Sequence, residues 1–104
     1  MIKNEAIDRL PEKYKKDIEK AVEILKNRGC TEVYLFGSLT HGNYCEKSDI
    51  DLGIKGLERK IYFKTWAEIE RVVNNQIDLV YFDGEDNDFA QFILQEESEL
   101  IQVL

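Results

Sequence analysis

Two acidic residues that could bind a metal ion alternate with aliphatic residues in the segment from Asp49 to Leu52. Asp49 and Asp51 are separated by Ile50, so a strand here would place both carboxylates on one face and the aliphatic side chains on the other. Neighbouring carboxylates repel each other unless a cation lies between them. A hard cation such as Mg²⁺ is typically bound by one or two carboxylates together with substrate phosphates. The alternation therefore predicts a site for Mg²⁺ and a phosphorylated substrate.

A Gly-Ser pair precedes these acids in the chain. Gly37 and Ser38 directly follow an apolar segment. Glycine allows close approach to the backbone, and consecutive backbone N–H groups can bind phosphate. We expect residues 38–44 to form a short helical turn whose first amides face a bound anion. Residues 45–48 then form a polar loop that leads to the acids.

A third acid interrupts the apolar segment Ile77 to Phe82. Asp78 is the only polar residue in the sequence IDLVYF, and such a local inconsistency often marks a functional position. In so small a sheet its strand would be a neighbour, or a near neighbour, of the strand that carries Asp49 and Asp51. A structural alternative remains, in which Asp49 and Asp51 protect a sheet edge and Asp78 pairs with a buried lysine.

The first half of the chain predicts the elements that lead to the Gly-Ser pair. Pro11 is suited to a first helical position and Gly29 to a C-terminal cap, which predicts a helix from Glu12 to Arg28. Its apolar positions at helical spacing are Tyr14, Ile18, Ala21, Val22 and Leu25. The β-branched and aromatic segment from Thr31 to Phe36 is apolar on both faces from Val33, as expected of an interior strand.

The second half predicts two further strands and two further helices. The strands run from Asp49 to Lys55 and from Ile77 to Phe82. Between them, Lys60 to Asn74 has helical periodicity, with a buried stripe expected at Phe63, Trp66, Ile69, Val72 and Val73. A last helix is expected from near Asp88 into the mid-90s or a little beyond. Helices and strands thus occur together, as in an α/β (α+β) fold, and a chain of 104 residues without repeats or linkers suits a single domain covering residues 1–104.

Composition excludes several classes of protein. The chain has 104 residues, of which 43% are hydrophobic and 34% charged, and no apolar run approaches the roughly 20 residues that span a bilayer. The N-terminal residues lack the apolar region of a signal peptide, so we expect a cytoplasmic protein with no membrane partner. Cys30 and Cys45 have no CxxC spacing and only His41 as a possible companion ligand, which favours free thiols over a zinc site.

The net charge of the chain argues against direct binding of nucleic acid. It is −7 at pH 7, whereas proteins that bind a nucleic-acid backbone usually gather Lys and Arg to neutralise phosphates. The first group of lysines, in residues 13–20, alternates with acids along the expected helix. This pattern is typical of a solvated helix surface.

The residues LFGSLTHGNYCEKSDIDL resemble the signature of the minimal nucleotidyltransferases, small members of the DNA polymerase beta-like superfamily. In that family a GS turn is followed about ten residues later by DxD and then by a third Asp. The matching positions here are Gly37, Ser38, Asp49, Asp51 and Asp78. The resemblance extends over most of the chain, from the first helix to the C-terminal segment.

This resemblance implies a nucleotidyltransferase fold, a small mixed sheet flanked by helices, and a Mg²⁺-dependent reaction. Gly37 and Ser38 would hold the triphosphate of ATP, with Ser48 as a further candidate for binding the nucleotide. Asp49, Asp51 and Asp78 would be the catalytic residues and would bind two Mg²⁺ ions, and Asp78 would also help to deprotonate an acceptor hydroxyl. The expected reaction transfers AMP from ATP to that hydroxyl and releases pyrophosphate. Where many family members have Arg before the second glycine, this chain has His41, which leaves a weakened or specialised activity open.

The resemblance also suggests a partner, because relatives with small-molecule or RNA acceptors have an additional domain. Single-domain members commonly act as antitoxins with a helical toxin of the HEPN type and modify one of its tyrosines. The acidic chain suits a basic protein partner. Tyr44, Tyr62 and Phe89 could contribute to that interface or pack within the protein. Two alternatives remain open: an antitoxin that binds nucleotide but neutralises its partner by contact alone, and a nucleotidyltransferase that modifies a small molecule such as an aminoglycoside.

Overall fold

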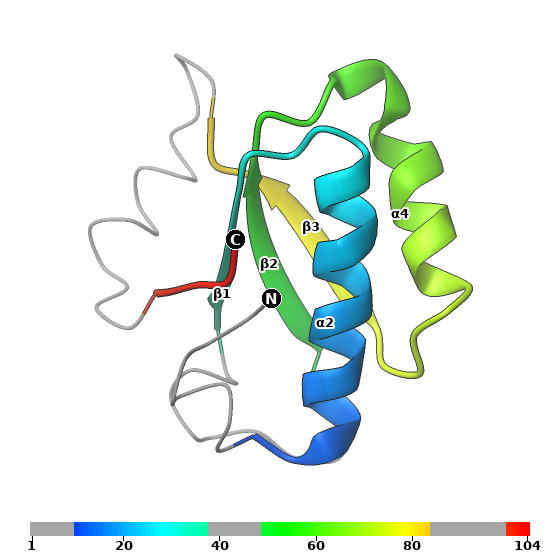
Figure 1. The fold of residues 1–104 in the computed structure, drawn as a ribbon, viewed down its shortest axis with the longest axis vertical. Coiled ribbons are helices and arrows are strands. Elements are labelled where there is room, and N and C mark those ends of the chain that lie inside the picture. The colour runs from blue at the N-terminus through cyan, green and yellow to red at the C-terminus, as the bar shows by residue number, and fades with distance from the viewer. Residues whose placement is uncertain (1–9, 38–48, 84–99) are drawn as a thin grey trace.

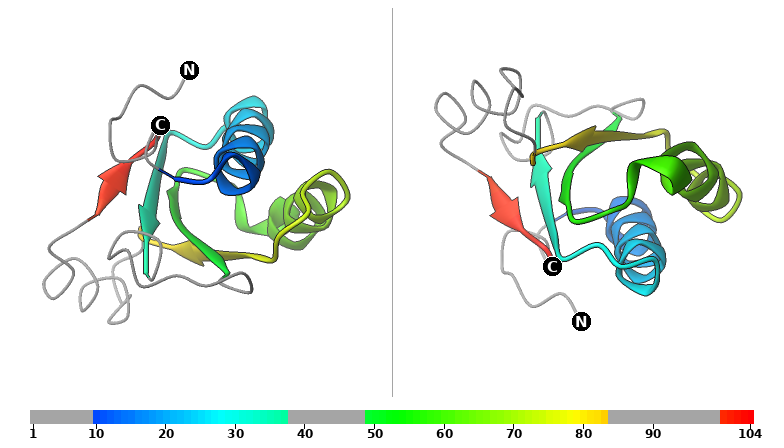
Figure 2. Two further views of the ribbon diagram at one scale, coloured as in Figure 1. Left: turned by 90° about the horizontal axis from the view of Figure 1, so that it is seen from below. Right: turned by 90° about the horizontal axis from the view of Figure 1, so that it is seen from above.

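The protein forms a mixed sheet with helices packed against one of its faces (Figures 1 and 2). The computed structural model describes residues 10–37, 49–83 and 100–104. The elements in these ranges are α2 (Glu12–Asn27), β1 (Glu32–Phe36), β2 (Ile50–Lys55), the 3-10 helix η1 (Arg59–Ile61), α4 (Tyr62–Glu70), β3 (Ile77–Tyr81) and β4 (Ile101–Gln102). No helix within them is long and apolar enough to cross a membrane.

The described strands form one sheet in the order β3-β2-β1-β4. Strand β1 pairs antiparallel with both β2 and β4, whereas β2 and β3 run parallel. The expectations of a mixed sheet and of an interior position for β1 are confirmed. The parallel pair is connected through α4, as parallel strands require a crossover.

Strand β4 was not expected from the sequence. It pairs with the free side of β1 through Leu35 opposite Ile101 and Tyr34 opposite Gln102, so Ile101 lies in a strand and does not continue a helix. A two-residue strand has no periodicity that a sequence pattern can reveal, and only its pairing with β1 defines it. The helix expected from near Asp88 lies outside the described residues, as does the turn expected at residues 38–44.

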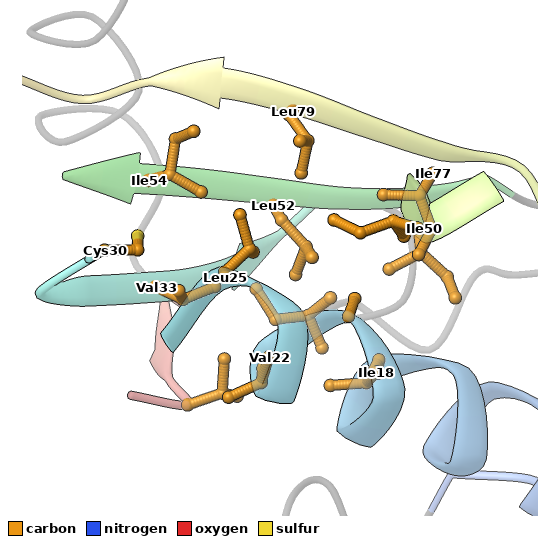
Figure 3. Packing of buried hydrophobic residues seen from close by; sticks show 14 of the residues in the cluster. Ile18, Val22, Leu25, Cys30, Val33, Ile50, Leu52, Ile54, Ile77 and Leu79 are labelled. Atoms are coloured by element: carbon orange, nitrogen blue, oxygen red, sulfur yellow. The ribbon is translucent and has the colours of Figure 1, made fainter. Parts of the chain in front are cut away.

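The main core lies between α2 and the sheet (Figure 3). Helix α2 begins after Pro11 and ends at Asn27, close to its predicted bounds, and its predicted apolar stripe is buried. The side chains that meet it from the strands include Val33, Leu35, Ile50, Leu52 and Ile54, all fully buried. Burial of a Leu or Ile side chain typically stabilises a fold by about 1.5–3 kcal/mol relative to its exposed state. This face of the sheet therefore contributes most to stability.

Helix α4 is shorter than predicted, and part of its predicted stripe is exposed. It ends at Glu70, not Asn74. Ile69 is fully buried, and Trp66 and Val73 pack against the core as expected. Phe63, however, is 76% exposed and Val72 is 45% exposed, which corrects the predicted stripe. The helix ends before Val72, and hydrogen bonds from Tyr62 and Trp66 to β3 fix its rotation.

The opposite face of the sheet has a smaller apolar cluster. Phe36 and Phe82 are buried there, and their rings lie 5.4 Å apart between centroids. Gly53 lies beneath Phe82, where a Cβ atom would overlap the Phe82 ring. A glycine inside a strand often marks such a close approach. Two acids lie on the same face as this cluster.

Candidate active site

Asp51 and Asp78 lie directly opposite each other on neighbouring parallel strands. Each is partly buried and alternates with core residues, Asp51 with Ile50 and Leu52, and Asp78 with Ile77 and Leu79. Because side chains alternate between faces along a strand, both carboxylates lie on the face opposite the helices. Asp49 immediately precedes β2 and is also partly buried. The expectation that the strands carrying these acids are neighbours is confirmed.

The acids influence one another electrostatically. The pKa of Asp51 is raised to about 6, first by burial and then by the negative charges of Asp78 and Asp49. Burial and like charges both favour the neutral form of a carboxyl group. A cation bound beside Asp51 would reverse this preference and favour the carboxylate. Without a cation, burial and the neighbouring acids therefore favour the protonated form of Asp51.

The structural alternatives for these acids are not supported. Strand β2 is interior, so Asp51 does not protect a sheet edge. Among the described residues no ion pair involves Asp78, so none of their lysines pairs with it.

Gly37 brings the end of β1 close to Asp51. Its backbone has φ +84°, a conformation that favours glycine. A Cβ atom at Gly37 would lie 3.2 Å from Cγ of Asp51 and would overlap Oδ2. The sheet register explains the approach, since Phe36 pairs with Asp51. Any larger residue at position 37 would therefore displace the carboxylate. Ser38, His41 and Ser48 lie outside the described residues.

Two side chains of α4 hold β3 on either side of Asp78. Trp66 Nε1 donates to the carbonyl of Ile77 at 2.7 Å, and the Tyr62 hydroxyl donates to the carbonyl of Leu79. These bonds occupy carbonyls on the outer side of an edge strand, which would otherwise be open to another strand. Burial, followed by the charge of Asp78, raises the pKa of Tyr62. Tyr62 thus packs against β3 and helps to hold the strand that carries Asp78.

Sequence reasoning missed this role of Tyr62 and Trp66, although a signal was present. Residues four apart lie on the same face of a helix. The Tyr62 hydroxyl and the Trp66 indole N–H can both donate to carbonyl acceptors at a partly buried position.

The donor chemistry of the acids suits Mg²⁺, which prefers carboxylate oxygens. As the side chains are positioned, however, no group of three or more His, Cys, Asp or Glu within residues 10–37, 49–83 and 100–104 forms an ion-binding cluster. The shared face and register bring Asp51 and Asp78 together, and the charge of Asp49 acts on Asp51. Metal binding by these three acids remains a prediction.

Comparisons with known proteins identify the fold. The chain is similar to a chain of a toxin–antitoxin solved with AMP-PNP, with a TM-score of 0.65 and 20% identity over 83% of this chain and 71% of the other. It is also similar to a chain of the toxin–antitoxin MntA-HepT, with a TM-score of 0.60 and 17% identity over 86% and 70% of the two chains. Comparison with curated proteins gives no match.

A family model described as polymerase beta, nucleotidyltransferase, matches residues 19–103. The match includes β1, Gly37 and all three acids. The chain therefore belongs to the polymerase beta nucleotidyltransferase family.

Proposed function

We propose that the protein is a Mg²⁺-dependent nucleotidyltransferase that transfers AMP from ATP to a hydroxyl group of a partner protein. The observation that carries this proposal is the pairing of Asp51 with Asp78 on adjacent strands, with Gly37 against Asp51. Membership of the nucleotidyltransferase family supports the reaction class.

The chain's own residues would have distinct roles. Asp49, Asp51 and Asp78 would hold two Mg²⁺ ions, and Gly37, Ser38 and Ser48 would bind the triphosphate. Bound Mg²⁺ would lower the pKa of the acceptor hydroxyl and neutralise charge on the leaving pyrophosphate. The acceptor oxygen forms a bond to the α-phosphorus as the bond from that phosphorus to pyrophosphate breaks, and Asp78 helps to remove the hydroxyl proton. The protein thus mainly positions reactants and charges.

The proposed acceptor is a tyrosine of a helical toxin of the HEPN type, which makes this protein an antitoxin. The similar solved structures are toxin–antitoxin chains, one of them with AMP-PNP. The net charge of −7 suits a basic partner, since complementary charge accelerates association and favours the correct partner.

Transfer of label tests the proposal. The purified chain would be incubated with α-labelled ATP, Mg²⁺ and the protein encoded by the adjacent gene, and we expect label on a tyrosine of that protein. Asp51→Asn should abolish labelling while the variant still melts cooperatively. Glu23→Gln, which removes one exposed carboxylate from α2, is the matched control and should label normally.

Other outcomes would separate the alternatives. Neutralisation of the toxin without label would show an antitoxin that acts by contact alone. Label on an aminoglycoside and not on the partner would show a small-molecule enzyme. Full labelling by Asp51→Asn would remove Asp51 from the catalytic site.

A further inference from the structure

An acidic residue on α2 binds the loop that leads into β3. Asp17 is 1% exposed, although it lies on the helix face that carries the apolar stripe. Its Oδ2 accepts hydrogen bonds from the backbone N–H of Asn74 at 3.0 Å and of Asn75 at 2.8 Å. The Asn75 side-chain amide donates to the same oxygen at 2.8 Å. One oxygen of Asp17 thus fixes two successive residues of the loop.

The loop connects these bonds directly to the candidate site. Asn75 is followed by Gln76, whose carbonyl accepts a hydrogen bond from the N–H of Ile50 at 2.9 Å. Ile50 lies between Asp49 and Asp51. Asp78 follows Gln76 by two residues. Asn75 thus immediately precedes the first hydrogen bond between β2 and the start of β3, one pair before Asp51 meets Asp78.

The register at this point matters because β3 carries different chemistry on its two faces. A shift of one residue would turn Asp78 toward the helices and Ile77 or Leu79 toward the site. Other contacts also hold the loop to α2: Lys20 Nζ donates to the carbonyl of Val72 at 3.2 Å, and the Asn75 side chain donates to the carbonyl of Lys13 at 3.3 Å. Among these contacts, only Asp17 is a buried side chain that accepts hydrogen bonds from backbone N–H groups of the loop.

Because Asp17 is buried, its hydrogen bonds to the loop are not readily replaced. Oδ1 of Asp17 is buried and has no hydrogen-bond partner among the described residues, so the group depends on the bonds to Oδ2. Removing a buried hydrogen-bond acceptor leaves its donors without a partner unless water replaces it. An apolar residue would complete the stripe of α2 but could not accept these N–H groups.

We propose that Asp17 is a positioning residue that holds β3 in the register at which Asp78 faces Asp51. This inference rests on the proposed function, in which Asp78 and Asp51 bind the metal together. Asp17 contacts neither the metal nor the substrate; it acts through Asn74, Asn75 and the start of β3.

The test measures Mn²⁺ binding, as a substitute for Mg²⁺, by the intact chain using electron paramagnetic resonance. Asp17→Ala should weaken Mn²⁺ binding about tenfold or more, the range typical of residues that orient metal ligands. Asp17→Asn retains one oxygen acceptor and should show a smaller loss. Amide hydrogen exchange should accelerate at residues 74–79 more than elsewhere in the sheet.

Two control variants separate positioning from general effects. Val22→Ala removes a buried side chain from the same helix but keeps every Asp17 contact, so it should lower the melting temperature and leave Mn²⁺ affinity within about twofold. Glu23→Gln removes one exposed charge from α2 and should leave Mn²⁺ affinity unchanged. If Asp17→Ala does not fold, Asn75→Ala removes the side-chain bonds to Asp17 and to the Lys13 carbonyl but keeps both backbone donors, and should give a partial loss of Mn²⁺ affinity.

Two results would overturn the inference. One is Mn²⁺ affinity in folded Asp17→Ala equal to that of the wild type. The other is acceleration of exchange that is the same in Asp17→Ala and Val22→Ala. If the wild type itself does not bind Mn²⁺, the proposed function fails, and exchange at residues 74–79 alone decides whether Asp17 positions β3.

Discussion

The two faces of β2 differ in what their residues contribute. Toward the helices, Ile50, Leu52 and Ile54 are fully buried in a continuous apolar core. On the other face, Asp51 keeps a raised pKa beside Asp78, and Gly53 lies beneath the Phe82 ring. Alternate residues of β2 therefore stabilise the core, and the residues between them form a charged, closely packed site. Substitutions at three consecutive positions, 51 to 53, test this difference.

The largest expected effect is on the helix-covered face. Leu52→Ala should lower the free energy of unfolding by about 3 kcal/mol, because it removes a fully buried side chain and leaves a cavity. Urea unfolding measures the change. Phe63→Ala is the control for loss of an exposed apolar side chain and should change stability by less than about 0.5 kcal/mol. Equal effects of the two variants would contradict the burial of Leu52 or the exposure of Phe63.

The next effect concerns close packing on the site face. Gly53→Ala should destabilise by about 2 kcal/mol, since the new methyl group requires the buried Phe82 ring to move. Phe82→Leu should make room for it, so the double variant should be more stable than the sum of the single changes by about 1 kcal/mol. Urea unfolding of all four proteins measures this coupling. Additive effects would show that Phe82 does not limit position 53.

The smallest effect is the pH dependence that Asp51 causes in the metal-free protein. Its pKa of about 6 lies above the ordinary value of 3.8, so between these pH values the folded protein binds a proton more tightly than the unfolded chain does. The stabilisation of the folded state by the proton on Asp51 is fully present below about pH 4 and is lost as the pH rises through 6. Because Asp51 is partly exposed, solvent screening limits the loss to on the order of 1 kcal/mol.

Asp51→Asn should not show this loss. With a chelator present, the variant should gain about 1 kcal/mol relative to wild type between pH 4 and pH 7, as measured by urea unfolding at each pH. Glu58→Gln, at an exposed position, is the control and should follow the wild type. Identical pH profiles for Asp51→Asn and wild type would show that Asp51 is not destabilised by burial and its acidic neighbours.

Local sequence patterns were sufficient for much of the fold. The helical spacing of apolar residues from Tyr14 to Leu25 determines α2. The β-branched and aromatic segments determine the positions of β1 and β3, and the alternation of acids with aliphatic residues determines that of β2. The alternation of Asp51 with Ile50 and Leu52 was enough to assign its face. These features depend on residues close together in the chain, whose geometry follows from the period of a helix or strand.

Only the tertiary structure decided how these elements meet. Contacts between residues far apart in the chain give the register of Asp51 with Asp78, the pairing of β4 with β1, the rotation of α4 that exposes Phe63, and the hydrogen bonds of Asp17 to the loop before β3. Local periodicity cannot specify such contacts, because it states which face a side chain occupies but not which strand or loop lies opposite. The sequence thus determined the acids and their face, whereas non-local hydrogen bonds determined which acids became neighbours.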